Sequence, residues 1–127
     1  MTIQNHLDQL RQNAPGCTLT AFGDLSSRLI LRSSSAAPCP REVLDGLSQK
    51  AAICFSVMED GHAPELIDAD CYGHSAIMFT PGQSFVFGRS DASADDVTCA
   101  VIESAQDVEQ ALRATRETVQ KIGEDAA

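Results

Sequence analysis

The amino-acid sequence predicts an α+β domain in the order helix, two strands, helix, three strands, helix. Apolar residues recur at helical spacing in three separate segments. Between them lie short apolar runs bounded by turn residues, a pattern typical of strands. The 127 residues are enough to bury a core, and neither a linker nor an internal repeat divides them. We therefore expect a single domain over residues 1–127.

The charge distribution argues against two classes of partner. Of the net charge of −9, residues 1–63 contribute −1 and residues 64–127 contribute −8. An acidic surface repels phosphate groups, so we expect neither a nucleic acid nor a membrane as partner. No run approaches the roughly 18 apolar residues of a membrane span, and the N-terminus shows no signal-peptide pattern. These features predict a cytoplasmic protein.

The first helix is predicted from Thr2 to about Asn13, where Ile3, Leu7 and Leu10 recur at helical spacing. Thr2 can act as the N-cap. Pro15-Gly16 then ends the helix, because proline lacks an N–H donor and glycine permits a positive φ.

Two strands are predicted next, Cys17 to Phe22 and Arg28 to Ser33, with the chain reversal at Gly23 to Ser26. Both faces of the first strand are at least half apolar, so we expect both to be covered. In the second strand, Leu29 and Leu31 share one face. The opposite face carries Arg28, Ile30 and Arg32. Two arginines on one face indicate a peripheral, partly solvated strand.

The second helix is predicted from Pro40 to Met58, since the missing N–H of proline costs nothing at a first helical position. Its broad apolar stripe consists of Val43, Leu44, Leu47, Ala51, Cys54, Phe55 and Met58. After an irregular acidic passage, the strands His74 to Thr80 and Ser84 to Arg89 flank Pro81-Gly82. That dipeptide suits the two central positions of a type II turn.

The last strand and the last helix have clear signals. Val97 to Ile102 is almost continuously apolar and is predicted to be an interior strand. A capping-box-like Ser104 and Asp107 begin the helix, and Gly123 is placed to end it. Charges of alternating sign at Glu109, Arg113, Glu117 and Lys121 predict a solvated face of this helix.

The sequence offers little for catalysis, so we expect no enzyme, no cofactor and no metal site. The five cysteines form no CxxC pair and are best explained as reduced thiols. Cys71-x2-His74 gives one pair of potential zinc ligands, whereas a structural site needs four. Neither an EF-hand pattern nor a phosphate-binding glycine loop occurs, and no serine lies in G-x-S-x-G.

The order of elements resembles the Roadblock / dynein light-chain domain family, which has a profilin-like fold. The features that carry the resemblance are Pro15-Gly16 before the first strand, Asp24 in the turn, Leu29 to Leu31 in the second strand, and the apolar helix near Pro40. Leu25-Ser26 stands where members often have glycine, and Ser104 to Asp107 lack the usual Gly and Arg. The resemblance is therefore to a diverged member.

The resemblance implies a five-stranded antiparallel sheet with helices on both faces, central first and last strands, and an edge position for the third strand. It also implies a homodimer with one ten-stranded sheet, joined through the third-strand edges and the second helix. Carried onto this chain, the interface would comprise Leu44, Leu47, Ala51, Phe55, His74, Ala76, Ile77, Met78 and Phe79. The implied function is a non-catalytic scaffold that regulates a small GTPase or another NTPase.

Two alternatives remain open at this point. A profilin- or PAS-like sensor would hold a small molecule between the sheet and a helix, although the chain has no Trp and only one Tyr to line a pocket. A metal-dependent protein would use Cys71 and His74 together with nearby carboxylates.

Overall fold

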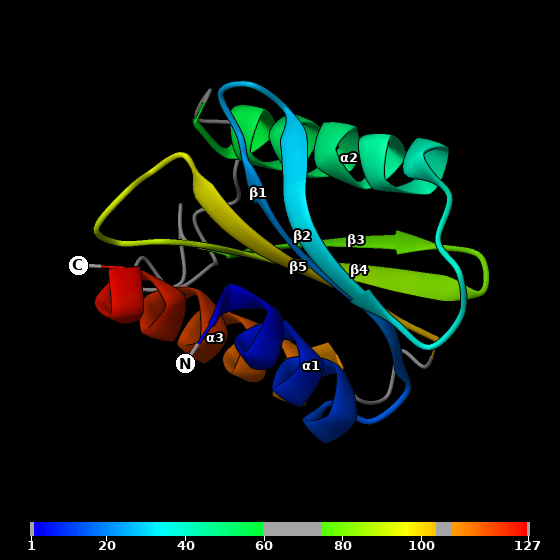
Figure 1. Cartoon of the computed structure of the whole chain (residues 1–127). Coiled ribbons are helices and arrows are strands. Elements are labelled where there is room, and N and C mark those ends of the chain that lie inside the picture. Colours follow the sequence, from blue (N-terminus) through cyan, green and yellow to red (C-terminus); the bar gives the residue numbers. More distant parts are fainter. Residues whose placement is uncertain (1, 60–74, 104–107, 127) are drawn as a thin grey trace.

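The computed structural model describes residues 2–59, 75–103 and 108–126. The elements, shown in Figure 1, are α1 (Ile3–Asn13), β1 (Cys17–Asp24), β2 (Leu29–Ser35), α2 (Arg41–Glu59), β3 (Ser75–Thr80), β4 (Gln83–Arg89), β5 (Asp96–Ile102) and α3 (Val108–Ala126). Their order confirms the predicted fold class. His74 lies outside the described residues, as do Cys71 and the predicted cap from Ser104 to Asp107.

The five strands form one antiparallel sheet in the order β2-β1-β5-β4-β3. The first and last strands of the sequence, β1 and β5, therefore lie inside the sheet, while β2 and β3 form its two edges. The expected central and edge positions are confirmed.

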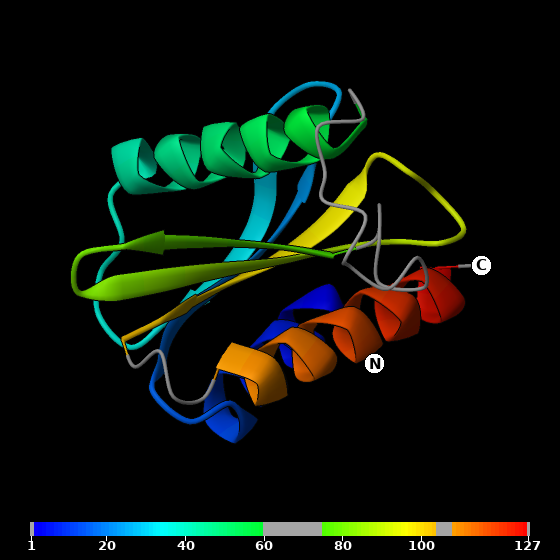
Figure 2. The ribbon, with the colours of Figure 1, turned by 180° about the vertical axis from the view of Figure 1, so that it is seen from behind.

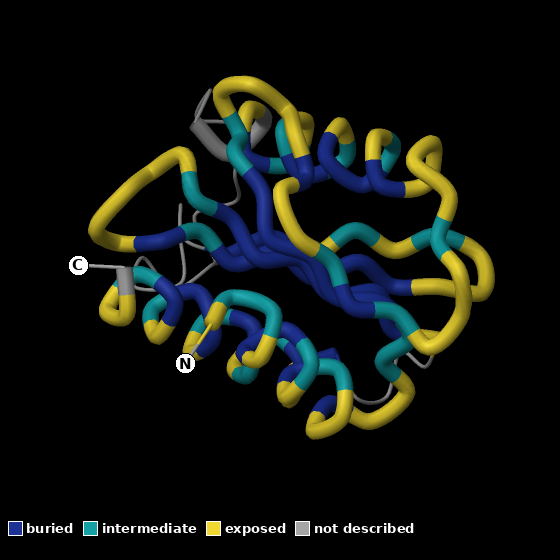
Figure 3. Tube along the Cα trace, viewed as in Figure 1, coloured by how far each residue is buried: buried dark blue, intermediate teal, exposed yellow. Residues whose placement is uncertain are grey.

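Helices cover both faces of the sheet, as Figures 1 and 2 show, and we name these faces by their helices. On the α2 face, Leu19 and Ala21 of β1 pack in one cluster with the inner side of α2. On the α1/α3 face, Phe22 packs with Leu7 of α1 and Ile122 of α3. The prediction that β1 is covered on both faces is confirmed, and Figure 3 shows the sheet as a buried layer between partly exposed helices.

The β1–β2 connection differs from the prediction. Arg28 lies in the turn with φ +57°, so β2 begins one residue later, at Leu29. A bulge separates the pairs Gly23–Ile30 and Phe22–Arg32. Because of the bulge, Ile30 and Arg32 do not share a face: Ile30 is buried against α2, while Arg32 is exposed. A bulge has no fixed sequence signature, which explains the wrong assignment.

The start of α2 and the end of α3 also differ from the prediction. The second helix begins at Arg41, and the carbonyl oxygen of Pro40 accepts hydrogen bonds from the N–H groups of Val43 (3.0 Å) and Leu44 (3.4 Å). Helix α3 continues past Gly123 to Ala126. Among the described residues, positive φ at glycine occurs at Gly16 and Gly82, so Gly123 does not adopt the conformation that ends a helix.

Two fully buried hydroxyl groups belong to the interface between α3 and the sheet. Within the described residues, neither Thr98 Oγ1 nor Thr115 Oγ1 has a hydrogen-bond partner. By contrast, the equally buried Thr20 donates its hydroxyl proton to the carbonyl oxygen of Leu7 at 2.9 Å. An unpaired buried hydroxyl costs free energy, whereas a paired one contributes to stability.

We expect Thr98→Val to leave the free energy of unfolding unchanged or to raise it by about 1 kcal/mol, because it removes an unpaired hydroxyl. The matched Thr20→Val should lower that energy by about 1 kcal/mol. Urea unfolding of both variants measures the difference. Equal destabilisation by the two substitutions would contradict it.

Candidate functional site

The two edges of the sheet differ in how well they are protected against pairing with another chain. The β2 edge is interrupted by its bulge and carries the exposed Arg32. Bulges and charged side chains are common means of blocking an edge. In β3, six consecutive residues pair with β4 from Ser75–Gly88 to Thr80–Gln83 without a shift in register. The β3 edge, Ser75–Thr80, is therefore the candidate site for interaction with another strand.

The side chains of β3 alternate between the two faces of the sheet. Ala76 is buried and Met78 is half-buried in the cluster beneath α2. Ile77 and Phe79 point to the other face and are 36% and 64% exposed. Large exposed apolar side chains next to a free strand edge are typical of an interaction surface.

The turn after β3 determines which backbone groups face outward. Gly82 has φ +83°, as the third residue of a type II turn requires, and Thr80 pairs with Gln83 across the turn. In an antiparallel pair, residues that exchange hydrogen bonds with the neighbouring strand alternate with residues that do not. Counting back from Thr80, the N–H and C=O groups of Ile77 and Phe79 face away from β4. Within residues 2–59, 75–103 and 108–126, no strand other than β4 pairs with β3, so these groups could pair with a new strand.

The predicted interface residues of α2 pack within their own chain. Leu44, Leu47, Ala51 and Phe55 are buried against this chain's own sheet. Among the α2 side chains that the structure describes, the large exposed apolar ones are Val43 and Ile53, at 49% and 57% exposure. Ile53 lies about half a turn from Ala51, on the side of the helix opposite the apolar stripe. An isoleucine at that position predicts an exposed apolar side chain, which the sequence prediction missed.

A groove of about 520 Å³ separates the N-terminal half of α2 from the sheet. Leu47 and Phe85 contribute apolar side chains, while Cys39, Lys50 and Glu103 contribute polar ones. The Lys50 ammonium lies over the Phe85 ring at 5.2 Å from its centroid. This size and this mixture of side chains are typical of a site for a small molecule.

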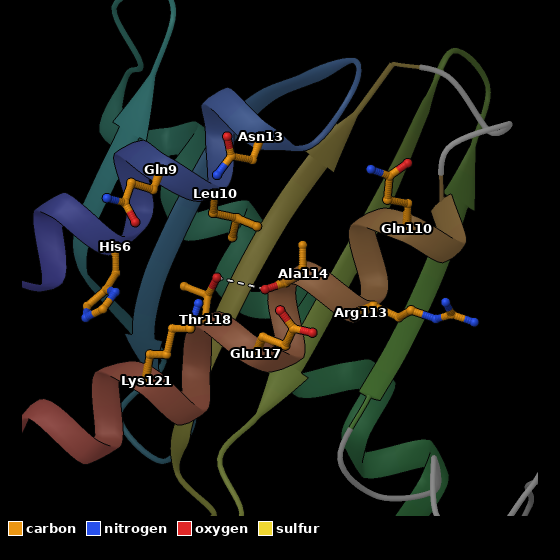
Figure 4. A pocket seen from close by; sticks show the side chains of 10 residues that line it. All are labelled: His6, Gln9, Leu10, Asn13, Gln110, Arg113, Ala114, Glu117, Thr118 and Lys121. Atoms are coloured by element: carbon orange, nitrogen blue, oxygen red, sulfur yellow. Dashed lines mark hydrogen bonds between the residues drawn. The ribbon is translucent and has the colours of Figure 1, made fainter.

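A second groove, of about 300 Å³, runs between α1 and α3 (Figure 4). Arg113, Glu117 and Lys121 line it from α3, while Gln9 and Asn13 line it from α1. The Arg113 side chain points away from α1. Most of the alternating row of charges therefore borders a groove, although Arg113 remains highly exposed and pairs with Glu109 at 2.9 Å. The lining is polar, with neither a buried charge nor a cluster of one sign.

A side-chain pair joins α1 to the last turn of α3. The buried His6 Nε2 lies 2.6 Å from Asp125 Oδ2. The hydrogen bond from His6 holds the pKa of the Asp125 carboxyl below its usual value. Because the folded-state pKa is lowered, the stabilisation by this carboxylate is present above its unfolded-state pKa and is lost as the pH falls through the folded-state value.

In an NMR titration we expect the Asp125 carboxyl to titrate below the ordinary pKa of aspartate, and His6→Ala to move its pKa upward. Asp8 is an internal control, because Ser34 and Gln4 lower its pKa and His6 is not involved. If Asp125 titrates identically in both proteins, the assigned cause is wrong.

Three of the cysteines have the properties of structural thiols. Burial raises the pKa of Cys17, Cys54 and Cys99, so these side chains stay protonated at neutral pH and are poor nucleophiles. Within residues 2–59, 75–103 and 108–126, no group of three His, Cys, Asp or Glu side chains could hold a metal ion. None of the helices described is long and apolar enough to cross a bilayer.

Comparison with solved structures identifies the fold. A Roadblock/LC7 domain from Streptomyces avermitilis matches with a TM-score of 0.71 and 10% identity, over 99% of this chain and 98% of that one. The chain has the fold of the Roadblock/LC7 domain. MglB with tetrameric arrangement matches with a TM-score of 0.67 and 13% identity, over 98% and 90% of the two chains.

The same architecture extends to profilins. A Schizosaccharomyces pombe profilin matches this Roadblock-fold chain with a TM-score of 0.62 and 10% identity, over 99% of this chain and 100% of that one. No protein-family model matches the sequence, and neither does any curated protein. The predicted profilin-like, Roadblock-like architecture is thus confirmed at the level of the fold.

Proposed function

We propose that the chain is a diverged Roadblock-like scaffold that dimerises through its β3 edges. Two antiparallel copies of β3 would join two five-stranded sheets into one of ten strands. The observation that carries the proposal is the regular β3 edge with its exposed Ile77 and Phe79. Such an edge pairs readily with an identical one, because a two-fold axis brings the same groups of both chains together.

The partner helices would lie near one another on the α2 face of the dimer. The exposed Val43 and Ile53 are apolar side chains in the described part of α2 that could contact a second chain. We therefore propose an interface built from Ile77, Met78 and Phe79 of β3 and from Val43 and Ile53 of α2. Leu44, Leu47, Ala51 and Phe55 support it from within the core.

Light scattering at micromolar concentration tests the assembly. We expect twice the chain mass of 13.5 kDa, and a monomer throughout the accessible concentration range would overturn the proposal.

As the resemblance to the Roadblock family implies, we propose that the dimer is non-catalytic and regulates a small GTPase or another NTPase. The sequence has no phosphate-binding loop of its own, so nucleotide chemistry would belong to the partner.

A native extract passed over the immobilised dimer, with and without GTP, tests the regulatory role. Recovery of one NTPase in stoichiometric amount, in a nucleotide-dependent manner, is the expected result. Recovery of no NTPase in either condition would contradict it.

A second candidate function is supported by the groove between α2 and the sheet. Its volume of about 520 Å³ and its Phe85–Lys50 pair would suit a small amphipathic ligand, as in a sensory domain. Native mass spectrometry of gently purified protein tests this candidate. A retained small molecule would favour it, and a spectrum of the bare chain would count against it.

A further inference from the structure

The groove of about 520 Å³ lies beside a helix that is too narrow to cover its face of the sheet. In the described part of the chain, α2 alone covers this face, whereas α1 and α3 share the other one (Figures 1 and 2). A helix with its side chains is about 10 Å wide, while five strands span about 19 Å. Part of the α2 face therefore stays open, and the groove lies there.

The floor of the groove is one apolar row across the three inner strands. Leu19 of β1 pairs with Val101 of β5, and Val101 pairs with Phe85 of β4. Leu47 and Val43 line the groove from α2. Because all five side chains are apolar, this part of the groove favours a hydrocarbon group over water.

One half-buried positive charge, the ammonium of Lys50, lies at the Phe85 end of this row. Its Nζ atom is 5.2 Å from the centroid of the Phe85 ring, and a Cβ atom at Gly46 would lie 3.7 Å from it. Within residues 2–59, 75–103 and 108–126, no carboxylate forms an ion pair with Lys50. Since a charge that is partly removed from water is stabilised by a counter-charge, this end of the groove favours an anionic group.

Two carboxylates limit how much negative charge the groove accepts. Glu42 and Glu103 also line it, and both residues are exposed. Water and salt screen exposed charges more than half-buried ones, so Lys50 dominates the field within the groove. Each additional negative charge on a ligand would add repulsion from the two glutamates. The arrangement therefore favours a ligand with one negative charge over a ligand with several.

The apolar part of the groove has a defined length. Lys50 and Val43 are seven residues apart in α2, about 10 Å along the helix axis. We propose that the groove binds a small carboxylic acid with an unbranched hydrocarbon chain, such as octanoate, whose extended length is similar. Its carboxylate pairs with the Lys50 ammonium, and its chain lies along Leu47 and Val43. This ligand class deepens the second candidate function, on which it rests, and does not require the dimer.

Three probes with the same chain and different head groups test the charge preference. In NMR titrations of the unmodified protein, octanoate should bind about tenfold more tightly than octanol, and octylamine most weakly. The Gly46 amide and Leu47 methyl signals should shift as the groove fills, while the methyl signals of Ile53, on the opposite side of α2, should not. Equal affinities, a preference for octylamine, or no shift at Gly46 and Leu47 would overturn the inference.

Lys50→Gln should weaken octanoate binding about tenfold and leave octanol binding unchanged, because it removes the charge but keeps a long side chain. The matched control is Lys121→Gln, which removes the other lysine of the chain, on α3, and should leave both affinities unchanged. If the two variants weaken octanoate binding equally, or if neither does, Lys50 is not the counter-charge and the inference fails.

A variant that fills the groove tests its location without changing a charge. Among the described side chains, only that of Lys50 would lie within 4 Å of a Cβ atom at Gly46. Leucine also favours a helix more than glycine does, so Gly46→Leu should fold. It should weaken the binding of octanoate and of octanol alike. Unchanged affinities would contradict a site beside Gly46.

Native mass spectrometry of gently purified protein separates a wrong ligand class from the failure of the sensory function. A retained long-chain carboxylic acid supports the inference. If the protein retains a different kind of small molecule and octanoate does not bind, the sensory function stands and only the ligand class is wrong. If it retains nothing and none of the three probes binds, the sensory function and the inference fail together.

Discussion

Ile77→Pro converts the dimer into a monomer, whereas Ile77→Ala leaves it a dimer. The N–H of Ile77 faces away from β4, so proline removes a hydrogen-bond donor to the second copy while the ladder with β4 stays intact. Edge strands tolerate proline, and the variant should fold. Ile77→Ala shortens the same side chain but keeps the donor. Light scattering should give 13.5 kDa for the proline variant and twice that mass for the alanine variant.

A substitution at a neighbouring position tests whether the effect depends on the direction of the N–H group. Met78→Pro removes an N–H that points toward Phe85 of β4, so it should destabilise the fold as well as alter assembly. A folded Ile77→Pro variant that still has the mass of a dimer would show that the chains associate through another surface.

Leu47→Ala lowers the free energy of unfolding by about 2–5 kcal/mol, because it removes buried apolar surface and leaves a cavity under α2. Leu47 is 2% exposed and packs in the cluster that joins α2 to the sheet. Ile53→Ala on the same helix changes that free energy by less than about 0.5 kcal/mol, since Ile53 is 57% exposed.

Both α2 substitutions are best compared by urea unfolding in the Ile77→Pro background, where association does not contribute. This pair of variants shows whether the apolar stripe of α2 covers the sheet of its own chain or contacts a second chain. A large loss for Ile53→Ala together with a small one for Leu47→Ala would mean that α2 is seated with the opposite side toward the sheet.

The parts of the fold that followed from the sequence are those fixed by local physical requirements. The alternation in β1 predicted a strand covered on both faces, as the structure has it. Pro81-Gly82 predicted the β3–β4 turn, because a type II turn needs a positive φ at its third residue and Gly82 has φ +83°. The continuous apolar run from Val97 likewise predicted the central strand β5.

Features that depend on tertiary packing did not follow from the sequence. The bulge in β2 moved Ile30 to the face opposite Arg32, although both had been placed together by simple alternation. Gly123 did not end α3, whose last turn continues to the contact between Asp125 and His6. A glycine allows a helix to end but does not require it.

The candidate site was predictable only in part. Ile77 and Phe79 are exposed on an edge strand, and their place in an interface stays a prediction. The role of the apolar stripe of α2 was harder to predict. A stripe that covers a sheet and a stripe that contacts a second chain have the same period of 3.6 residues. The structure shows that Leu47 and Phe55 cover the sheet.

Hydrogen exchange at β3 tests the central claim most directly. In the proposed dimer, the amide protons of Ile77 and Phe79 are hydrogen-bonded to the second copy. We expect them to exchange slowly in the unmodified protein and rapidly after dilution below the dissociation constant of the dimer. The Met78 amide, which faces β4, provides an internal reference at both concentrations. Rapid exchange at Ile77 and Phe79 in a sample that light scattering shows to be dimeric would contradict pairing through the β3 edges.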